Sequence, residues 1–266
     1  MGSLVFRIAG PAAASYSNAY CVDLEKGSSQ YLEASSTSAL DTTDGSTAFS
    51  ISMWVKPESQ SVSALANKGD NGFILKTDFS GNVTFIVGTS TVNIQCLAGA
   101  DWSNTPLDLG TWVHLVFTYD GSATTGGIKA YVNGSDDDRN HWKAASFGTG
   151  TSTSNSDPFL IGAAKANHAA LAGGNQSTFD GKIDEVSYWG EAISASEVTA
   201  IYNSGTPADL AQHSAYDDLT SWYRMGDHAS DDLTADSGQI TDAKGSNHLT
   251  PKNTTSSNKV EDTPGS

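Results

Sequence analysis

The stretch GKIDEVSYWGEAISASEVTAIYNSG, residues 181–205, decides the fold that we expect for this chain. Its first nine residues alternate between two faces at period two and are rich in β-branched and aromatic side chains, as in a β-strand. Ser194 and Glu197 then stand at capping-box spacing, and Gly205 supplies a left-handed stop. The stretch therefore predicts one strand followed by one helix of about two turns.

Other short alternating runs recur along the chain, separated by Gly, Asn and Asp residues that favour turns. The dipeptide Asn133-Gly134 indicates a tight hairpin turn, because both residues tolerate positive φ angles. Apart from the helix after residue 194, only residues 207–213 suggest helix, and more weakly. The predicted strands are residues 49–57, 73–77, 83–87, 92–96, 112–119, 128–134, 181–189 and 219–227. This pattern predicts an all-β protein, either a sandwich or a barrel, with one short helix.

The composition narrows the classes of function. The chain has 266 residues and 38% hydrophobic residues, which is enough for one sizeable core. Its net charge is −16, from 30 acidic and 14 basic residues, so we expect no nucleic-acid partner. No apolar run approaches the roughly 18 residues of a membrane span, so we expect no membrane insertion. The segment before residue 16 resembles a secretory signal poorly. We expect Cys21 and Cys96 as free, buried thiols, although one disulfide between them stays open.

The order of several segments identifies a family. FSISMWVKP, LANKGDNGFIL, LGTWVHLVFTYDG, IKAYVNG and FLIG follow one another and end in FDGKIDEVSYWGEAISASEVTAIYNSG. Together they resemble the laminin-G-like jelly-roll domains of the concanavalin A-like lectin and glucanase superfamily over residues 16–205. The resemblance implies a two-sheet antiparallel jelly-roll sandwich that binds glycans or proteins or acts as a spacer, and many family members hold calcium. We divide the chain into an N-terminal segment (1–15), the jelly roll (16–205) and a C-terminal extension packed on the sandwich with a loose tail (206–266). Whether this extension completes the sandwich or reaches to a neighbour stays open.

The segment SWYRMGDHASDDLTADSGQITDAKGSNHLTPKN, residues 221–253, resembles a segment that follows such domains in proteins of marine tailed phages. This second resemblance implies a non-catalytic protein on the virion surface, as a capsid decoration or tail fibre. Its partners would be host glycans or other virion proteins, and it would form a homo-oligomer. The alternatives are a secreted or cell-surface carbohydrate-binding lectin, which would be extracellular, and a polysaccharide-cleaving enzyme.

Asp184 is the candidate metal ligand. Strict alternation places its side chain on the same face as Val186 and Tyr188, inside the core. A buried carboxylate needs a partner, and three remain open: backbone N–H groups of a neighbouring loop, a base such as Arg224, or a cation. The family resemblance favours Ca²⁺ as that cation, with Asp23 as a second ligand.

Candidate glycan-binding residues lie in two predicted loops. Asn140, His141 and Trp142 stand together after an acidic run, and Trp102 stands in GADWSNTP. A sugar site needs an aromatic ring for the sugar face and polar side chains for the hydroxyl groups, and these loops offer both.

Catalysis is not expected. Glucanases of the resembled superfamily carry a Glu-x-Asp-x-Glu strand, which this chain lacks. The nearest pair, Asp184 and Glu185, would lie on opposite faces of a regular strand, whereas retaining hydrolysis needs two carboxyl groups about 5 Å apart. His114 lies between apolar neighbours in a predicted strand, and we expect it to be structural.

Overall fold

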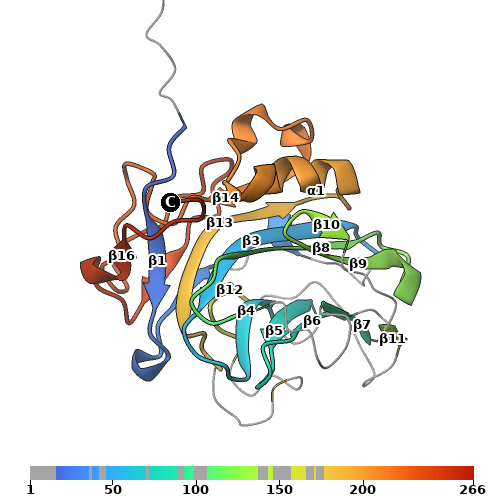
Figure 1. The fold of residues 1–266 in the computed structure, drawn as a ribbon, viewed down its shortest axis with the longest axis horizontal. Helices are drawn as coiled ribbons and strands as arrows, with labels where there is room; N and C mark the ends of the chain where they lie inside the picture. The colour runs from blue at the N-terminus through green and yellow to red at the C-terminus, as the bar shows by residue number, and fades with distance from the viewer. Residues whose placement is uncertain are drawn as a thin grey trace, which may run out of the picture.

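The computed structural model describes residues 16–35, 38–41, 46–69, 72–88, 93–98, 107–136, 143–145, 157–165, 171 and 177–266. Within this part of the chain, two antiparallel sheets of eight strands each form a sandwich (Figure 1). Sheet A has the strand order β10-β9-β8-β3-β13-β1-β16, with β14 also paired to β13. Sheet B has the order β11-β7-β6-β5-β4-β12-β2-β15. The predicted all-β jelly-roll sandwich with one short α-helix is confirmed.

Each predicted run forms a strand, and the described residues form eight further strands that these runs did not include. Sheet A consists of β1 (Cys21–Leu24), β3 (Phe49–Pro57), β8 (Val113–Tyr119), β9 (Ile128–Val132), β10 (Ser135–Asp136), β13 (Gly181–Trp189), β14 (Leu219–Tyr223) and β16 (Lys259–Val260). Sheet B consists of β2 (Tyr31–Ala34), β4 (Ser63–Lys68), β5 (Phe73–Thr77), β6 (Val83–Gly88), β7 (Asn93–Ala98), β11 (Lys143–Ala145), β12 (Phe159–Ile161) and β15 (Thr250–Lys252). The Asn133-Gly134 turn joins β9 to β10, with φ angles of 49° and 75°.

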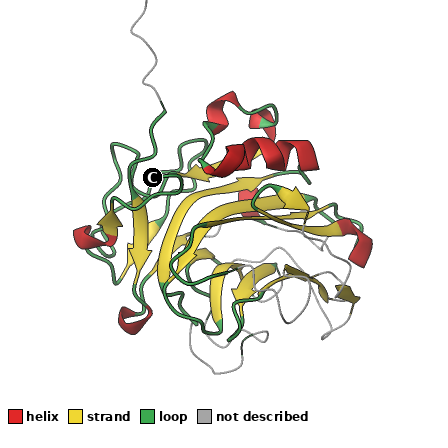
Figure 2. Cartoon of the chain, viewed as in Figure 1, coloured by secondary structure: helices red, strands yellow, loops and turns green. Residues whose placement is uncertain are grey.

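The helices are short and lie at the periphery of the sandwich (Figure 2). The α-helix α1 (Ala195–Tyr202) begins at the predicted capping box, in which Ser194 N–H donates to Glu197 Oε2 at 2.7 Å. The weaker candidate, residues 207–213, forms only a short 3₁₀ turn. The 3₁₀ helices are η1 (Lys26–Ser28), η2 (Ser38–Leu40), η4 (Thr125–Gly127), η5 (Asn203–Gly205), η6 (Leu210–Gln212), η7 (Tyr216–Asp218) and η8 (Ser256–Asn258). None of the described helices has the length and apolarity that spanning a membrane requires.

The described residues form two large apolar clusters and a small third one around Ala64 and Ile74. The larger one fills the space between the sheets, where Phe49 contacts Phe73 and stacks on Tyr188 with ring centroids 5.1 and 5.6 Å apart. The second lies on the opposite face of sheet A, where Val198 and Ile201 of α1 pack on the strands. Figure 1 shows α1 over this outer face of sheet A. Each fully buried side chain of this size stabilises the fold by about 1.5–3 kcal/mol.

A β-bulge in β13 changes which side chains face the core. The register between β13 and β3 shifts between Asp184 and Ser187, and Glu185 has a φ of 45°. Ile183 and Val186 therefore both point into the larger core, although they are three residues apart. The expectation that Asp184 shares a face of the sheet with Val186 and Tyr188 is wrong, because the bulge interrupts the alternation. Asp184 and Glu185 both lie on the outer face of sheet A.

The C-terminal extension contributes to both sheets. Of its strands, β14 and β16 join sheet A, and β15 joins sheet B. Near the end of the chain, Asp262 accepts hydrogen bonds from Lys56 Nζ and from the Trp112 indole, and its carbonyl faces the free, buried Cys21 thiol. The sequence left open whether residues 206–266 complete the sandwich, and in the structure they do.

We predict that Gly181→Ala strongly destabilises the fold. Gly181 has a φ of 136°, and a Cβ there would lie 2.3 Å from the Lys56 carbonyl oxygen in the centre of sheet A. The free energy of unfolding in urea should fall by more than about 2 kcal/mol. Gly27→Ala is the matched control, because a Cβ there meets nothing within 4 Å, and its stability should stay within about 0.5 kcal/mol of the wild type. Equal stability of the two variants would contradict this account of the central sheet.

Candidate functional site

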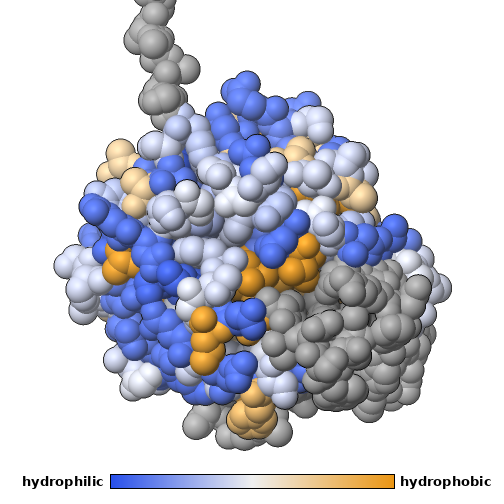
Figure 3. All heavy atoms as spheres, viewed as in Figure 1, coloured by the Kyte–Doolittle hydropathy of each residue, from blue (hydrophilic) through white to orange (hydrophobic). Residues whose placement is uncertain are grey.

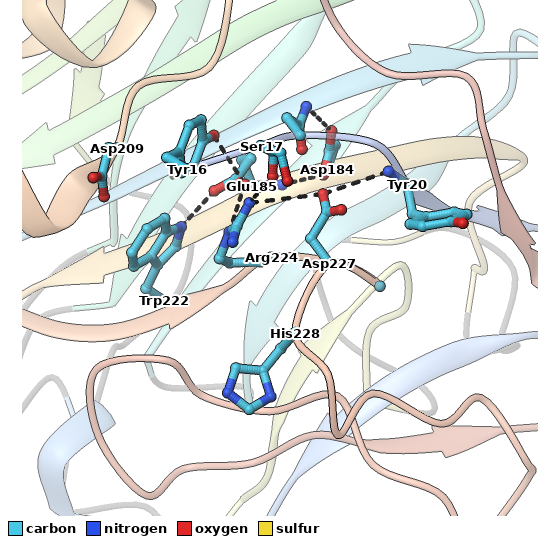
Figure 4. Close-up of polar contacts among 12 residues, drawn as sticks. Tyr16, Ser17, Tyr20, Asp184, Glu185, Asp209, Trp222, Arg224, Asp227 and His228 are labelled. Atoms are coloured by element: carbon cyan, nitrogen blue, oxygen red, sulfur yellow. Dashed lines mark hydrogen bonds and ion pairs between the residues drawn. The ribbon is translucent and has the colours of Figure 1, made fainter. Parts of the chain in front are cut away.

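The bulge places two carboxyl groups side by side on the outer face of sheet A, among residues from both ends of the described chain (Figure 4). Asp184 is fully buried and Glu185 is 5% exposed. Burying two carboxyl groups costs several kcal/mol unless hydrogen bonds and opposite charges compensate. The hydrogen-bond partners of these two carboxyl groups therefore explain how the neighbouring chain segments are held in place.

Glu185 has three side-chain donors. Its Oε1 accepts hydrogen bonds from the Tyr16 hydroxyl at 3.1 Å and from Arg224 Nε at 3.2 Å. Its Oε2 accepts one from the Trp222 indole N–H. The Arg224 guanidinium lies over the Tyr16 ring, 4.5 Å from its centroid, and Tyr16 stacks on Trp222. Burial raises the pKa of Glu185, and Arg224 together with these donors opposes the rise.

Asp184 has only uncharged donors. Its Oδ1 accepts from the Glu185 backbone N–H at 2.8 Å, and its Oδ2 accepts from Asn18 Nδ2 at 2.9 Å. Burial, and next the charge of Glu185, raise the pKa of Asp184 well above the ordinary value of a carboxyl group. Of the three partners left open by the sequence, the backbone N–H that Asp184 finds belongs to Glu185, the next residue of β13, and not to a neighbouring loop, while Arg224 pairs with Glu185 instead.

The same network ties the N-terminal arm, residues 16–20, to the C-terminal extension. Arg224 Nη2 donates to the Ser17 carbonyl, and Asp227 accepts backbone hydrogen bonds from Ala19 and Tyr20 at 3.1 and 3.4 Å. Figure 4 shows Arg224 between Glu185 and Asp227, with Tyr16 and Trp222 flanking it. The arm is thus held by side chains that lie more than 160 residues away in the sequence.

A cleft of about 370 Å³ opens beside this network. Three segments line it: the N-terminal arm, the turn after α1, and the last residues of the chain. Tyr16 and Asn18 belong both to the cleft and to the buried network, so the network forms its inner wall. The lining residues are Tyr16, Ser17, Asn18, Asn203, Thr206, Pro207, Asp209, Thr263, Pro264, Gly265 and Ser266. The cleft offers hydroxyl and amide groups, one aromatic ring and the Asp209 carboxylate, and its lining has no Lys or Arg.

An acidic cluster lies at the edge of sheet A. The carboxylate oxygens of Asp23, Glu25 and Glu58 are within 4.8 Å of one another. Lys182 Nζ is 3.4 Å from Asp23 Oδ2 and also pairs with Glu58, so an ammonium group already neutralises part of the cluster. Asp184, the other predicted calcium ligand, lies two residues further along β13 than Lys182 and is outside this cluster. The cluster offers the oxygen ligands that calcium prefers, and only Asp23 of the predicted pair belongs to it.

The predicted glycan-binding residues Trp102, Asn140, His141 and Trp142 lie outside the described residues, so their role stays a prediction. Sequence reasoning missed Tyr16, Asn18 and Trp222 as members of one site. No local pattern could have indicated them, because only the folded chain brings them to Glu185.

The sequence profile of the concanavalin A-like lectin/glucanases superfamily matches residues 26–199, which is more than half of the chain. The chain belongs to this superfamily. The curated proteins offer no match to the sequence. The cleft lies wholly outside the matched range, since its residues come from positions 16–18, 203–209 and 263–266. Membership in the superfamily therefore accounts for the sandwich and not for the cleft.

Solved structures with a similar fold include one described as a carbohydrate-binding protein from Bacteroides ovatus. It is 20% identical with a TM-score of 0.60, and the match covers 92% of this chain and 61% of that one. This chain therefore spans less than two thirds of that protein. Weaker likenesses are a pentraxin from Limulus polyphemus (16% identity, TM-score 0.45, covering 70% and 82%) and a sialidase CBM40 domain from Ruminococcus gnavus (13%, 0.43, covering 68% and 96%). At such identities the first likeness shows a shared fold.

The carboxyl pair differs from the catalytic pair of the superfamily's glucanases. The bulge corrects the expectation that Asp184 and Glu185 face opposite sides, since both lie on the outer face. Yet all four of their oxygens accept hydrogen bonds from the chain itself, Asp184 is fully buried, and Glu185 is only 5% exposed. A glycosidic oxygen could not approach them, so we assign this pair a structural role.

We predict that this pair makes the fold less stable as pH rises from about 4 through neutrality. Both pKa values are raised in the folded state, so the folded chain retains protons that the unfolded chain has lost above about pH 4. Asp184→Asn, which cannot ionise, should flatten the decline of unfolding free energy with pH, as measured by urea denaturation from pH 4.5 to 8.

Asp232→Asn is the control, because the exposed Asp232 has a lowered pKa and ionises below this range in both states. Its profile should run parallel to that of the wild type. An Asp184→Asn profile as steep as the wild type would contradict the buried pair as the source of the slope.

Proposed function

We propose that the chain is a non-catalytic carbohydrate-binding domain and that the cleft between the N-terminal arm and the C-terminal end takes the sugar. The observation that carries this proposal is the lining of the cleft. Hydroxyl and amide groups of Ser17, Asn203 and Thr206 stand beside the Tyr16 ring, and sugar binding uses this combination. The volume of about 370 Å³ lies within the range of about 300–1,000 Å³ typical of small-ligand sites.

The charge of the cleft lining favours neutral sugars over acidic ones. Asp209 contributes a carboxylate, and the described residues of the lining include no Lys or Arg that could pair with an acidic sugar. The net charge of −16 acts in the same direction. The ligand is therefore a neutral saccharide, and sialylated or uronic glycans should bind worse than their neutral counterparts.

Glycan-array binding followed by calorimetric titration tests this proposal. Thr206→Val removes a hydroxyl without changing shape, and Asn203→Gly removes an amide while keeping the left-handed φ of 46°. Each should weaken binding of a neutral oligosaccharide about tenfold, the loss of one or two hydrogen bonds. Thr124→Val, on an exposed turn outside the cleft, should bind like the wild type. Equal affinity of all four proteins would place the sugar elsewhere, and a wild type that binds no glycan would remove the proposal.

The surface of a tailed-phage virion stays the proposed location, with glycans or other virion proteins as partners and a homo-oligomer as the assembly. The acidic composition and the resemblance of residues 221–253 support it. Antibodies against the purified chain should label intact particles in electron micrographs. Labelling of cell surfaces or culture medium without particles would favour the alternative, a secreted or cell-surface lectin.

A calcium ion is the cofactor that this proposal includes, and the cluster of Asp23, Glu25 and Glu58 supports it. Calcium there would replace the Lys182 ammonium between the carboxylates, so binding should raise the melting temperature, and EDTA should lower it. Glu58→Gln should abolish the effect, whereas the exposed Asp217→Asn should preserve it. A melting temperature that changes with neither calcium nor EDTA would rule calcium out as the cofactor.

A further inference from the structure

The turn of the β5–β6 hairpin carries an exposed aromatic side chain, Phe79. Phe79 is 75% exposed, and it shares that property with one other large hydrophobic residue of the described chain, Leu109, which is 51% exposed. Single exposed apolar side chains are common on protein surfaces and need no function. The way in which this hairpin is held, and its polar surroundings, distinguish Phe79.

Asp78 ties the tip of the hairpin into one conformation. Its Oδ1 accepts from the backbone N–H groups of Ser80 and Asn82 at 2.7 and 3.1 Å, and its Oδ2 accepts from Asn82 Nδ2 at 2.8 Å. Backbone hydrogen bonds from Asp78 N–H to the Asn82 carbonyl and from Gly81 N–H to the Asp78 carbonyl close the turn. A ring on a turn fixed in this way loses little conformational entropy when a ligand covers it.

Polar groups surround the base of this turn. A cavity of about 10 Å³, the size of one water molecule, lies between the hairpin and the segment after β3. Its lining includes Ser59, Gln60 and Ser61, together with Asp78 of the turn. Ser61 Oγ is buried there without a hydrogen-bond partner, so a water in the cavity would satisfy it and could bridge to a ligand.

Leu109 lies at the same end of the sandwich. Gly110 N–H donates to the Pro57 carbonyl at 2.8 Å, and Pro57 and Leu107 both line the small cavity. Two exposed apolar side chains are too few for a protein interface, which buries about 1,000 Å² or more. Phe79 directly follows Asp78, which lines the small cavity together with Ser59 and Gln60, and one ring near such groups fits the apolar face of a single sugar ring.

We propose that Phe79 is the stacking platform of a second carbohydrate subsite, with Ser59 and Gln60 as its hydrogen-bonding groups. The cavity at its base has no Lys or Arg in its lining, so the sugar is neutral. This subsite shares no residue with the cleft beside Tyr16 and lies inside the range matched by the superfamily, residues 26–199. The inference rests on the proposed function in taking a carbohydrate as the ligand.

Titration of the full chain with a neutral oligosaccharide selected on the array tests it. Phe79→Ala should weaken binding at least about tenfold, whereas Phe79→Tyr keeps the ring and should stay within about twofold of the wild type. Leu109→Ser is the matched control, since it removes the other exposed apolar side chain and should leave the affinity within about twofold. Because Phe79 and Leu109 are exposed, all three variants should have the same melting temperature as the wild type.

The outcomes separate the two proposals. If the wild type binds no carbohydrate, both fail. If the wild type binds and Phe79→Ala binds equally well while Thr206→Val does not, the cleft stands and the second subsite is overturned. If Phe79→Ala and Leu109→Ser both change the oligomeric state in sedimentation and neither changes sugar affinity, this end of the sandwich is a protein contact, and the inference is likewise overturned.

Discussion

Two carboxyl groups buried side by side on β13 hold in place the chain segments that lie outside the range matched by the superfamily, residues 26–199. Without donors, Asp184 and Glu185 would cost the fold several kcal/mol. The donors come from Asn18 and Tyr16 of the N-terminal arm, from Trp222 of β14, and from Arg224 just beyond it. The arm and the C-terminal extension are therefore required partners of the central strand, and they are not appendages on a finished sandwich.

This requirement also shapes the surface. Tyr16 and Asn18 point their polar atoms at the buried acids and form, with the residues after α1 and at the end of the chain, the wall of the cleft. On the face drawn in Figure 3, the coloured residues are mostly hydrophilic, and hydrophobic residues form small separate patches. The cleft is therefore shaped by the segments that flank the jelly roll.

The superfamily fold and the cleft are thus formed by different parts of the chain. The jelly roll between residues 26 and 199 explains the stacked sheets and the hairpin that carries Phe79. The cleft depends on residues before and after that range. Sequence likeness to the superfamily consequently says little about the sugar that we propose as the ligand, and the lining of each surface must be considered separately.

The sequence by itself determined the elements whose information is local. Alternation at period two predicted β3, β5, β6 and β7, and the capping box of Ser194 and Glu197 predicted α1. Only the tertiary structure decided where Asp184 points. A bulge depends on a positive φ at Glu185, and no residue type demands it there, so alternation carried through the bulge assigns the wrong face. The partners of the two acids lie about 40 and more than 160 residues away, and proximity across such separations is a property of the packed sheets.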